Sequence, residues 1–384
     1  MNYRRHKDLL ISEIGLGCYG LSGAYGPTDI ESYKAALRRG YELGVNFFDT
    51  AEAYGDAEHV LGEVIKPFRQ HVYVSTKVGV REGFNPDLSA DYVRKACERS
   101  LQALKMETID LYQVHFDDPQ TPVAETVAAL EGLVQQGKIR YYGLGHLPAL
   151  RVWEYVQKGN VFSVMMELSA AARDARDEIL PFCQEHNLAA IAFSVTGRGL
   201  LTGAIEMNDA FEADDIRSID PLFQKTNFQS GLRVADKLTE IGARHGKTGA
   251  QTAIAWVLAQ PGVTCALTGP SSIAHLEENI GGSDWTFTEL DIIKFENYLK
   301  VEELRLKIEG RFEVSRILTE PLPADPNQAL IDLVYACENA VRLKMIDEQV
   351  LMPVFITLME LRDDMDEEAL DKMRHIQAEL KEYA

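Results

Sequence analysis

Short β-branched runs alternate with amphipathic helical stretches from about residue 40 to about residue 270, and this alternation constrains the fold more than any other feature. Strands that alternate with helices are joined by crossovers and form a parallel sheet. Seven candidate strands are visible, and we expect an eighth near Ile216–Ile219. Such a series suits a (β/α)8 TIM barrel, an α/β fold, and it also suits a doubly wound sheet. The seven candidates are Val45–Asp49, Val72–Val78, Ile109–His115, Ile139–Leu144, Val161–Glu167, Leu188–Phe193 and Val263–Leu267.

One glycine pattern near the start of the chain bears on the choice between these folds. Residues Gly15–Gly20 match the letters G-x-G-x-x-G. A dinucleotide-binding Rossmann domain needs this turn between a strand and a helix, with an acidic residue further on for the ribose. Here the glycines are not followed by a suitable helical pattern or by an acidic residue at the position that would bind the ribose. We therefore expect these glycines to close a hairpin at the bottom of a barrel or to line its site.

The character of the chain changes from about Gly310 onward. Three prolines form a stiff connector, and three helical patterns follow it. Asp325-Pro326 is a good helix start, because Asp caps a helix and Pro suits its first position. We expect a barrel over residues 1–310 and a C-terminal α-helical extension over residues 311–384. The prolines of the connector are Pro321, Pro323 and Pro326.

Composition excludes several classes of partner. The formal net charge is -20 at pH 7, and so acidic a chain repels phosphate backbones and anionic lipid. We expect no nucleic-acid partner and no membrane partner. No secretion signal or membrane-spanning run is visible, and the five cysteines show no metal-ligand spacing. We therefore expect buried free thiols, no metal and a cytoplasmic protein.

Four polar residues stand at or just beyond the ends of candidate strands. Asp49, Lys77 and His115 each close a strand, and Tyr54 follows in the loop after Asp49. In a parallel barrel all strand C-termini open on one face, so these residues would converge there. Taken singly, each residue type is more often a helix cap, a surface group or a core group. All four at such openings would be a much rarer coincidence.

This convergence would make chemical sense at a carbonyl group. A tyrosine is a poor acid at neutral pH, and a neighbouring ammonium group lowers its pKa. We expect Lys77 to do this for Tyr54, while Asp49 keeps Lys77 charged and in place. Hydride that reaches a carbonyl carbon builds negative charge on the oxygen. Tyr54 and His115 would stabilise that charge, and Tyr54 would supply the proton.

The residues around these four resemble a known family. The stretch Gly44–Gly62, with Asp49-Thr50-Ala51 and Tyr54-Gly55, looks like the signature of the aldo-keto reductases. The resemblance covers about Tyr3 to Leu290, and its ordered motifs make it specific. It implies a (β/α)8 barrel that binds NAD(P)(H) without a Rossmann domain. Further similar motifs are Tyr112–His115, Ala192–Ser194, Gly197–Gly203, Thr248–Gln251 and Leu276–Asn279.

The resemblance also implies roles for particular residues. Asp49, Tyr54, Lys77 and His115 match the family's catalytic tetrad. Ser194, Gly197 and Leu201 match its diphosphate-binding loop, and Glu278 and Asn279 match the pair that binds adenine. We expect cofactor to be bound by these residues and by others at corresponding positions where the sequence departs from the family's pattern. The full set is Gly145, His146, Ser194, Gly197, Leu201, Gly269, Ser271, His275, Glu278 and Asn279.

The sequence departs from the family's pattern at the nicotinamide. The fourth strand usually ends in Gly-x-Ser-Asn, but here Gly145-His146 replace the last two residues. The fifth strand carries Met165 where a Gln is usual, and Leu168-Ser169 replace a Tyr-Asn pair. His146 could replace one of the lost hydrogen bonds, could face substrate, or could be a surface residue.

The segment Gly269–Leu276, which precedes Glu278-Asn279, contains neither Lys nor Arg. The family often uses one of these residues there to bind the 2'-phosphate of NADP(H). NADP(H) is the family default, and NAD(H) is a serious alternative.

We expect an oxidoreductase that acts on a small aldehyde, ketone or sugar-like alcohol. The alternative is a cofactor-binding regulatory or redox-sensing subunit that docks a partner protein through its tail. The C-terminal helices could also join copies into a homo-oligomer, or form a lid over the substrate. Expected substrate-lining residues are Phe84, Phe116, His146 and residues near Phe223.

Overall fold

The protein is described by a computed structural model, which covers residues 1–81, 85–363 and 365–383. Residue contacts divide the chain into two compact units. The first comprises Met1–Thr202 and Leu238–Phe287, and the second comprises Gly203–Lys237 and Thr288–Ala384. The sequence boundary expected at residue 310 falls inside a single helix, α10 (Glu289–Thr319). Phe84, one of the expected lining residues, lies outside the described residues.

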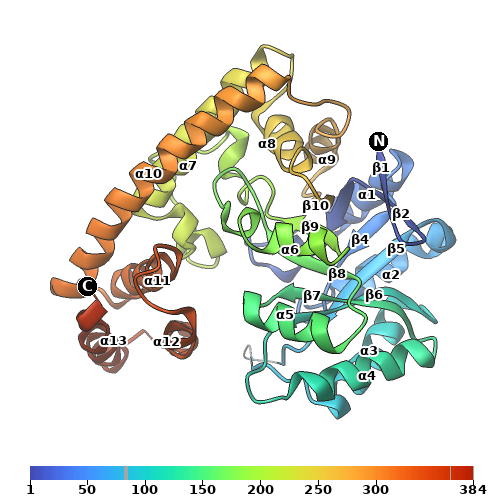
Figure 1. Cartoon of the computed structure of the whole chain (residues 1–384), viewed down its shortest axis with the longest axis horizontal. Coiled ribbons are helices and arrows are strands. Elements are labelled where there is room, and N and C mark those ends of the chain that lie inside the picture. Colours follow the sequence, from blue (N-terminus) through green and yellow to red (C-terminus); the bar gives the residue numbers. More distant parts are fainter. Residues whose placement is uncertain (82–84, 364, 384) are drawn as a thin grey trace. The chain divides into compact units, whose positions relative to one another are not determined.

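The first unit contains a closed barrel of eight parallel strands, which confirms the predicted (β/α)8 class (Figure 1). The strands succeed one another around the barrel in sequence order, and the last, β10, pairs with the first, β3. The strands are β3 (Ile14–Gly17), β4 (Phe47–Asp49), β5 (Tyr73–Val78), β6 (Ile109–Phe116), β7 (Ile139–His146), β8 (Ser163–Glu167), β9 (Ala189–Phe193) and β10 (Val263–Thr268).

The expected position of the eighth strand was wrong. Ile216–Ser218 forms a short 3-10 helix in the second unit, and the missing strand is β3. Gly15 and Gly17 therefore belong to a barrel strand and do not close a hairpin. A Cβ atom on Gly15 would come within 2.7 Å of the Leu267 side chain and 2.9 Å of Phe47. Two of the four residues of β3 are glycines and only Ile14 is β-branched, so the strand lacks the pattern by which the other strands were predicted.

A hairpin of β1 (Tyr3–His6) and β2 (Leu9–Ser12) precedes the barrel. Arg4 donates to the backbone oxygens of Leu258 and Val263, and Val263 begins β10. The hairpin thus lies at the N-terminal end of the strands. Leu9 and Ile11 pack there against a buried cluster of barrel residues. That end of the barrel is therefore closed by apolar packing, which leaves the C-terminal end for chemistry.

Helices follow the strands and surround the barrel (Figure 1). Their starts are encoded locally, because side-chain oxygens accept hydrogen bonds from the first free backbone N–H groups. Asp29 and Ser89 do so for α1 and α3, and Thr248 forms a reciprocal capping box with Gln251 for α8. The helices of the first unit are α1 (Ile30–Glu42), α2 (Ala57–Ile65), α3 (Ala90–Leu104), α4 (Val123–Gln135), α5 (Ala149–Lys158), α6 (Ile179–Glu185), α8 (Gly249–Leu258) and α9 (Ile273–Ile280). Helix α7 (Lys225–Ala243) begins in the second unit.

The second unit contains α10 and the three predicted C-terminal helices, α11 (Pro326–Arg342), α12 (Glu348–Glu360) and α13 (Glu367–Leu380) (Figure 1). The predicted start of α11 is confirmed: the Asp325 side chain accepts from the Asn327 N–H, and Pro326 is the first helical residue. Leu333, Leu358 and Met373, one from each of these helices, are fully buried in one core cluster.

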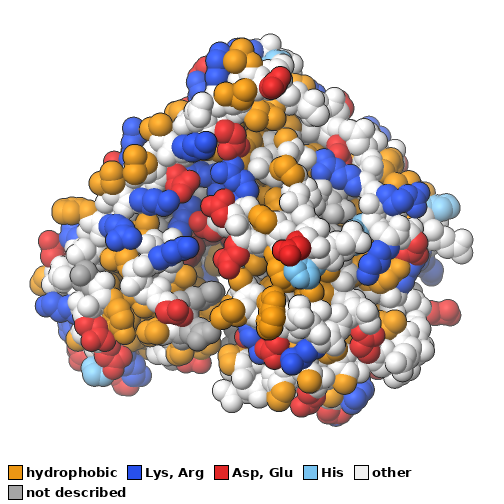
Figure 2. All heavy atoms as spheres, viewed as in Figure 1, with side chains coloured by type: hydrophobic (Ala, Val, Ile, Leu, Met, Phe, Trp, Pro, Cys, Tyr) orange, Lys and Arg blue, Asp and Glu red, His pale blue; other side chains and the backbone are white. Residues whose placement is uncertain are grey.

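Helix α10 also exposes an apolar stripe. Val301, Leu304, Ile308 and Phe312 are 59%, 61%, 64% and 73% exposed, and their spacing of three or four residues places them on one side of the helix. Figure 2 shows hydrophobic side chains among Lys and Arg along the α10 edge of the second unit.

No helix in the described part of the chain is long and apolar enough to cross a bilayer. All five cysteines are buried and unpaired, as expected.

Candidate functional site

The site begins with a buried ion pair on neighbouring strands. Asp49 ends β4 and Lys77 lies near the end of β5. The Lys77 Nζ atom lies 2.5 Å from Oδ2 of Asp49, and it donates a second hydrogen bond of 2.8 Å to the Thr50 backbone oxygen. The Lys77 side chain is 2% exposed, and lysine is rarely buried so fully unless it is paired. Burial raises the pKa of Asp49, and Lys77 offsets only part of this effect.

Tyr54 and His115 complete the cluster. The Tyr54 hydroxyl oxygen lies 3.4 Å from Nε2 of His115, and the two rings meet edge to face. The Lys77 Nζ atom stands 4.9 Å from the centre of the Tyr54 ring. The structure therefore brings together all four residues that the sequence placed at strand openings.

Lys77 was expected to lower the pKa of Tyr54, and the structure does not support this. Burial raises the pKa of Tyr54 well above its ordinary value, and the negative charge of Asp49 adds to this rise. Burial is the larger cause, and the charge of Lys77 is directed at Asp49, 2.5 Å away, and not at the phenol. His115 shifts the other way, because burial, Lys77 and His146 hold its pKa well below 6.5. At neutral pH the pair is thus a protonated phenol beside a neutral imidazole.

The loop after β9 has an unusual backbone. Ser194, Gly197, Arg198 and Gly199 all have φ between 53° and 94°. For Ser194 and Arg198 this left-handed conformation costs about 1–3 kcal/mol, and such strain is concentrated at functional sites. Leu201, which follows, is fully buried. This loop contains three of the residues expected to hold the diphosphate of a cofactor.

The end of β10 offers a second cofactor-binding segment. The Thr268 hydroxyl is buried without a hydrogen-bond partner among the described residues. A Cβ atom on Gly269 would meet nothing within 4 Å, so the space beside it is open. Ser271 hydrogen-bonds Nδ1 of His275 at 2.7 Å, and Ser272 caps the start of α9.

Glu278 and Asn279 are partly exposed near the end of α9. An unpartnered hydroxyl, open space and a strained glycine-rich loop suit a dinucleotide laid over the barrel rim.

The nicotinamide side of the predicted site is less conventional. Gly145 fits tightly, since a Cβ atom there would lie 2.6 Å from the backbone oxygens of Val114 and His115. His146 ends β7 with an exposed side chain. Met165 lies in the apolar core of the barrel.

Phe223 is buried in the second unit, where its ring contacts those of Phe211 and Phe228.

Some residues near the site were not found from the sequence. Tyr19 contacts the Tyr54 ring at 5.1 Å, and Tyr25 contacts Tyr19 at 5.7 Å. Both follow β3. Because β3 was not predicted from the sequence, the loop after it was not recognised as part of the rim of the barrel. Thr268 follows a predicted strand, and its position at that strand's end was the signal.

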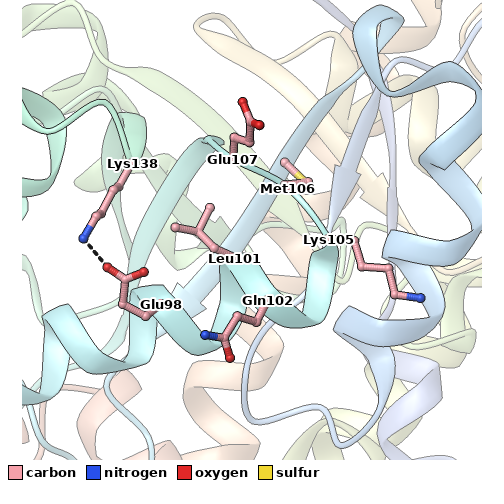
Figure 3. A pocket seen from close by; sticks show the side chains of 7 residues that line it. All are labelled: Glu98, Leu101, Gln102, Lys105, Met106, Glu107 and Lys138. Atoms are coloured by element: carbon pink, nitrogen blue, oxygen red, sulfur yellow. Dashed lines mark hydrogen bonds and ion pairs between the residues drawn. The ribbon is translucent and has the colours of Figure 1, made fainter.

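A surface pocket elsewhere in the first unit lies at the other end of the strands. It is formed where α3 ends and where β6 and β7 begin, and Figure 3 shows Lys138 reaching toward Glu98 across it. The tetrad residues lie near the opposite ends of their strands, so this pocket does not belong to the candidate site. In the part of the chain that the structure describes, no group of three or more His, Cys, Asp or Glu could hold a metal ion.

The fold and the cluster together define a parallel β/α barrel with acid–base residues at its C-terminal rim. The family model for the aldo/keto reductases matches residues 13–299. The chain belongs to the aldo/keto reductase family, whose members are nicotinamide-dependent oxidoreductases.

Individual relatives agree. Aldo-keto reductase str7 of Strobilurus tenacellus is 34% identical over 302 residues, which cover 75% of this chain and 89% of that protein. The glycerol dehydrogenase AKR11B4 of Gluconobacter oxydans has a similar structure, with a TM-score of 0.71 and 28% identity, over 78% of this chain and 96% of that one. A Klebsiella pneumoniae aldo/keto reductase solved with NADP and acetate gives a TM-score of 0.62 and 27% identity, over 78% and 95%.

Proposed function

We propose that this protein transfers hydride between NAD(P)(H) and a small carbonyl or alcohol, with Tyr54 as the general acid and base. The observation that carries the proposal is the approach of the Tyr54 hydroxyl to Nε2 of His115 at 3.4 Å. Two hydrogen-bonding groups at this separation can hold one carbonyl oxygen between them. The bound nicotinamide supplies the hydride.

In the reducing direction, the Tyr54 hydroxyl and the neutral His115 imidazole hold the substrate oxygen. As hydride reaches the carbonyl carbon, negative charge grows on that oxygen. Tyr54 then transfers its phenolic proton, the oxygen becomes a hydroxyl group, and Tyr54 is left as a phenolate. The Lys77 ammonium lies 4.9 Å from the ring centre and is the positive charge beside this phenolate, although burial and Asp49 keep the pKa of Tyr54 high before the reaction. In the oxidising direction, the phenolate accepts the proton of the alcohol.

The cofactor is proposed to lie along Ser194, Gly197 and Leu201, then Gly269, Ser271 and His275, and to end at Glu278 and Asn279. NADP(H) is the default, and the solved relative with NADP supports it. The absence of Lys and Arg in the segment before Glu278 keeps NAD(H) as the alternative. Titrating the protein with each cofactor by fluorescence separates the two. An affinity for NADPH at least ~10-fold higher, about 1.4 kcal/mol, supports NADP(H).

The test of the reaction uses purified protein, NADPH or NADH, and a panel of aldehydes and ketones. We expect cofactor oxidation that falls by about 10²–10⁴-fold in Tyr54→Phe, with unchanged cofactor affinity. Tyr3→Phe is the control, since it removes a phenol hydroxyl from the hairpin at the other end of the barrel, where Tyr3 is 44% exposed. Cofactor binding without turnover of any carbonyl overturns the proposal and favours the regulatory-subunit alternative.

A further inference from the structure

Seven aromatic rings form a continuous series at the C-terminal end of the barrel. Each ring contacts the next, with centroids 4.6 Å to 6.1 Å apart. The series starts in the loop after β3 and ends at β9, and it passes through Tyr54 and His115. In order, the rings are Tyr25, Tyr19, Tyr54, His115, Phe116, His146 and Phe193.

Several of these rings are open to solvent although they are large. Tyr19, Tyr25 and Phe116 are each 37% exposed, and His146 is exposed as well. Exposed apolar surface around a polar reacting centre is typical of a ligand-binding site. The rings beside the tetrad thus form a wall that a flat molecule can cover.

His146 is the polar member of the part of this wall that runs from His115 to Phe193. In the pairing of β6 with β7, His146 is the direct partner of Phe116, so the two side chains lie on the same side of the strand pair. The His146 ring is 6.1 Å from that of Phe116 and 6.0 Å from that of Phe193. None of the described residues hydrogen-bonds this imidazole, which leaves one donor and one acceptor available.

The surroundings keep the imidazole neutral and limit what else the wall can bind. Although part of the ring is exposed, the residues around it desolvate its charged form, and this effect together with Arg198 lowers the pKa of His146, against the opposing charge of Glu167. Arg198 donates to Glu167 at 2.7 Å, and Lys77 is bonded to Asp49. These charges are directed at each other, so beyond His115 the wall presents two apolar rings, Phe116 and Phe193, and the neutral imidazole of His146.

We infer that Phe116 and His146 form a specificity subsite for aromatic aldehydes or ketones that carry a hydroxyl or another hydrogen-bonding oxygen on the ring. The inference rests on the proposed function. Phe116 covers the face of the substrate ring, and edge-to-face or offset stacking is favourable between aromatic rings. His146 binds the ring oxygen. A sugar-like substrate has no flat apolar face for Phe116 to cover.

The experiment compares kcat and KM for benzaldehyde, its three monohydroxy isomers, butanal and glyceraldehyde, with the cofactor that binds better. We expect kcat/KM about tenfold higher for benzaldehyde than for butanal or glyceraldehyde. At least one hydroxybenzaldehyde should exceed benzaldehyde by a further several-fold, through a lower KM.

Two variants separate the roles of the two residues. His146→Phe keeps a ring but removes the hydrogen bond, so it should abolish the preference for the hydroxybenzaldehyde and retain the preference for aromatic substrates. Phe116→Leu removes the ring but leaves His146, so it should abolish the preference for aromatic substrates over butanal and retain the preference for the hydroxybenzaldehyde over benzaldehyde. Trp153→Leu is the control, because Trp153 is an aromatic residue 53% exposed on α5 and outside the ring series. Thermal unfolding by circular dichroism confirms that each variant is folded.

The failures are distinguishable. Absence of turnover with every carbonyl overturns the proposed function itself. Turnover without an aromatic preference, or a hydroxyl preference that survives His146→Phe, overturns only the subsite. A His146→Phe protein that binds cofactor at least tenfold more weakly by fluorescence, with an unaltered substrate preference, assigns His146 to the nicotinamide amide and also overturns it.

Discussion

Lys77 donates a hydrogen bond of 2.5 Å to Asp49 from a side chain that is 2% exposed. Two opposite charges are thereby removed from water behind Tyr54. Their mutual attraction offsets the free-energy cost of removing both charges from water, whereas either charge buried alone would destabilise the fold. The pair is therefore a structural element of the barrel as well as a proposed part of its chemistry.

Breaking this pair should destabilise the fold. Lys77→Met leaves the Asp49 carboxylate buried without its partner, and we expect the free energy of unfolding to fall by about 3–5 kcal/mol. The double variant Lys77→Met/Asp49→Asn removes both charges and should regain a large part of this loss. Urea unfolding of the wild type, both single variants and the double variant measures the coupling. Additive effects would show that the two residues do not depend on each other.

His115 should make the protein less stable in mild acid. Its pKa is held well below 6.5 in the fold, so below about pH 6.5 the unfolded chain binds a proton that the folded chain does not. Stability from this group is complete above pH 6.5 and falls with pH by up to about 1.4 kcal/mol per unit. His6 and His146 shift in the same direction. We therefore expect the free energy of unfolding to fall less between pH 7.5 and pH 5.5 in His115→Asn than in the wild type, as measured by urea unfolding at each pH. An equal loss in both proteins contradicts the prediction.

Tyr54 should remain protonated throughout the neutral and mildly alkaline range. Its pKa is raised well above the ordinary tyrosine value, so deprotonation of the free enzyme does not remove the proton donor. We predict that kcat/KM for carbonyl reduction shows no decline between pH 7 and pH 9. A fall with an apparent pKa of about 7–8 would mean that Lys77 lowers the pKa of Tyr54 after all.

Gly145 should not tolerate the serine that the family usually has there. A Cβ atom at this position would lie 2.6 Å from two backbone oxygens of β6, so the strands would have to separate. We expect Gly145→Ser to lower the melting temperature by several degrees, equivalent to about 1–3 kcal/mol. Gly269→Ser is the matched control, since the space beside Gly269 is open. Equal melting temperatures for the two variants would show that β6 and β7 can adjust.

The expected homo-oligomer through the C-terminal helices remains a prediction, and the stripe on α10 supplies a surface for it. If copies pair there, Leu304→Glu/Ile308→Glu places charges in an apolar contact. Light scattering should then give the mass of one chain, 43.0 kDa, where the wild type gives a multiple. Leu150→Glu on α5 is the control, at a residue 68% exposed. A wild type that scatters as a single chain rejects the prediction.

Much of the barrel could be predicted because most of its strands are short, buried, largely apolar runs that alternate with helical patterns. The tetrad could be predicted for a related reason: a polar residue that closes an apolar strand is conspicuous. β3 was missed because Gly15 and Gly17 make up half of its four residues, which removes the pattern that identifies a strand. The position of the following loop, which contains Tyr19 and Tyr25, was missed for the same reason.

The pKa of Tyr54 could not be predicted from residue types. Sequence reasoning placed Lys77 near Tyr54 and inferred a lower pKa. The outcome depended first on how deeply the Tyr54 hydroxyl is buried and then on the negative charge of Asp49 near it, and neither can be read from residue types. Likewise, the stripe on α10 is visible as a pattern of apolar letters, but whether its side chains are covered depends on tertiary packing.

The pairing of β3 with β10 has a consequence for biosynthesis. These strands are the first and last of the barrel, so the ring cannot close until Thr268 has left the ribosome. Until then, β3 and β9 each present an unpaired edge that can join a neighbouring nascent chain. A polypeptide that stops before Val263 would keep both edges open, and its fate would be aggregation instead of a smaller working enzyme.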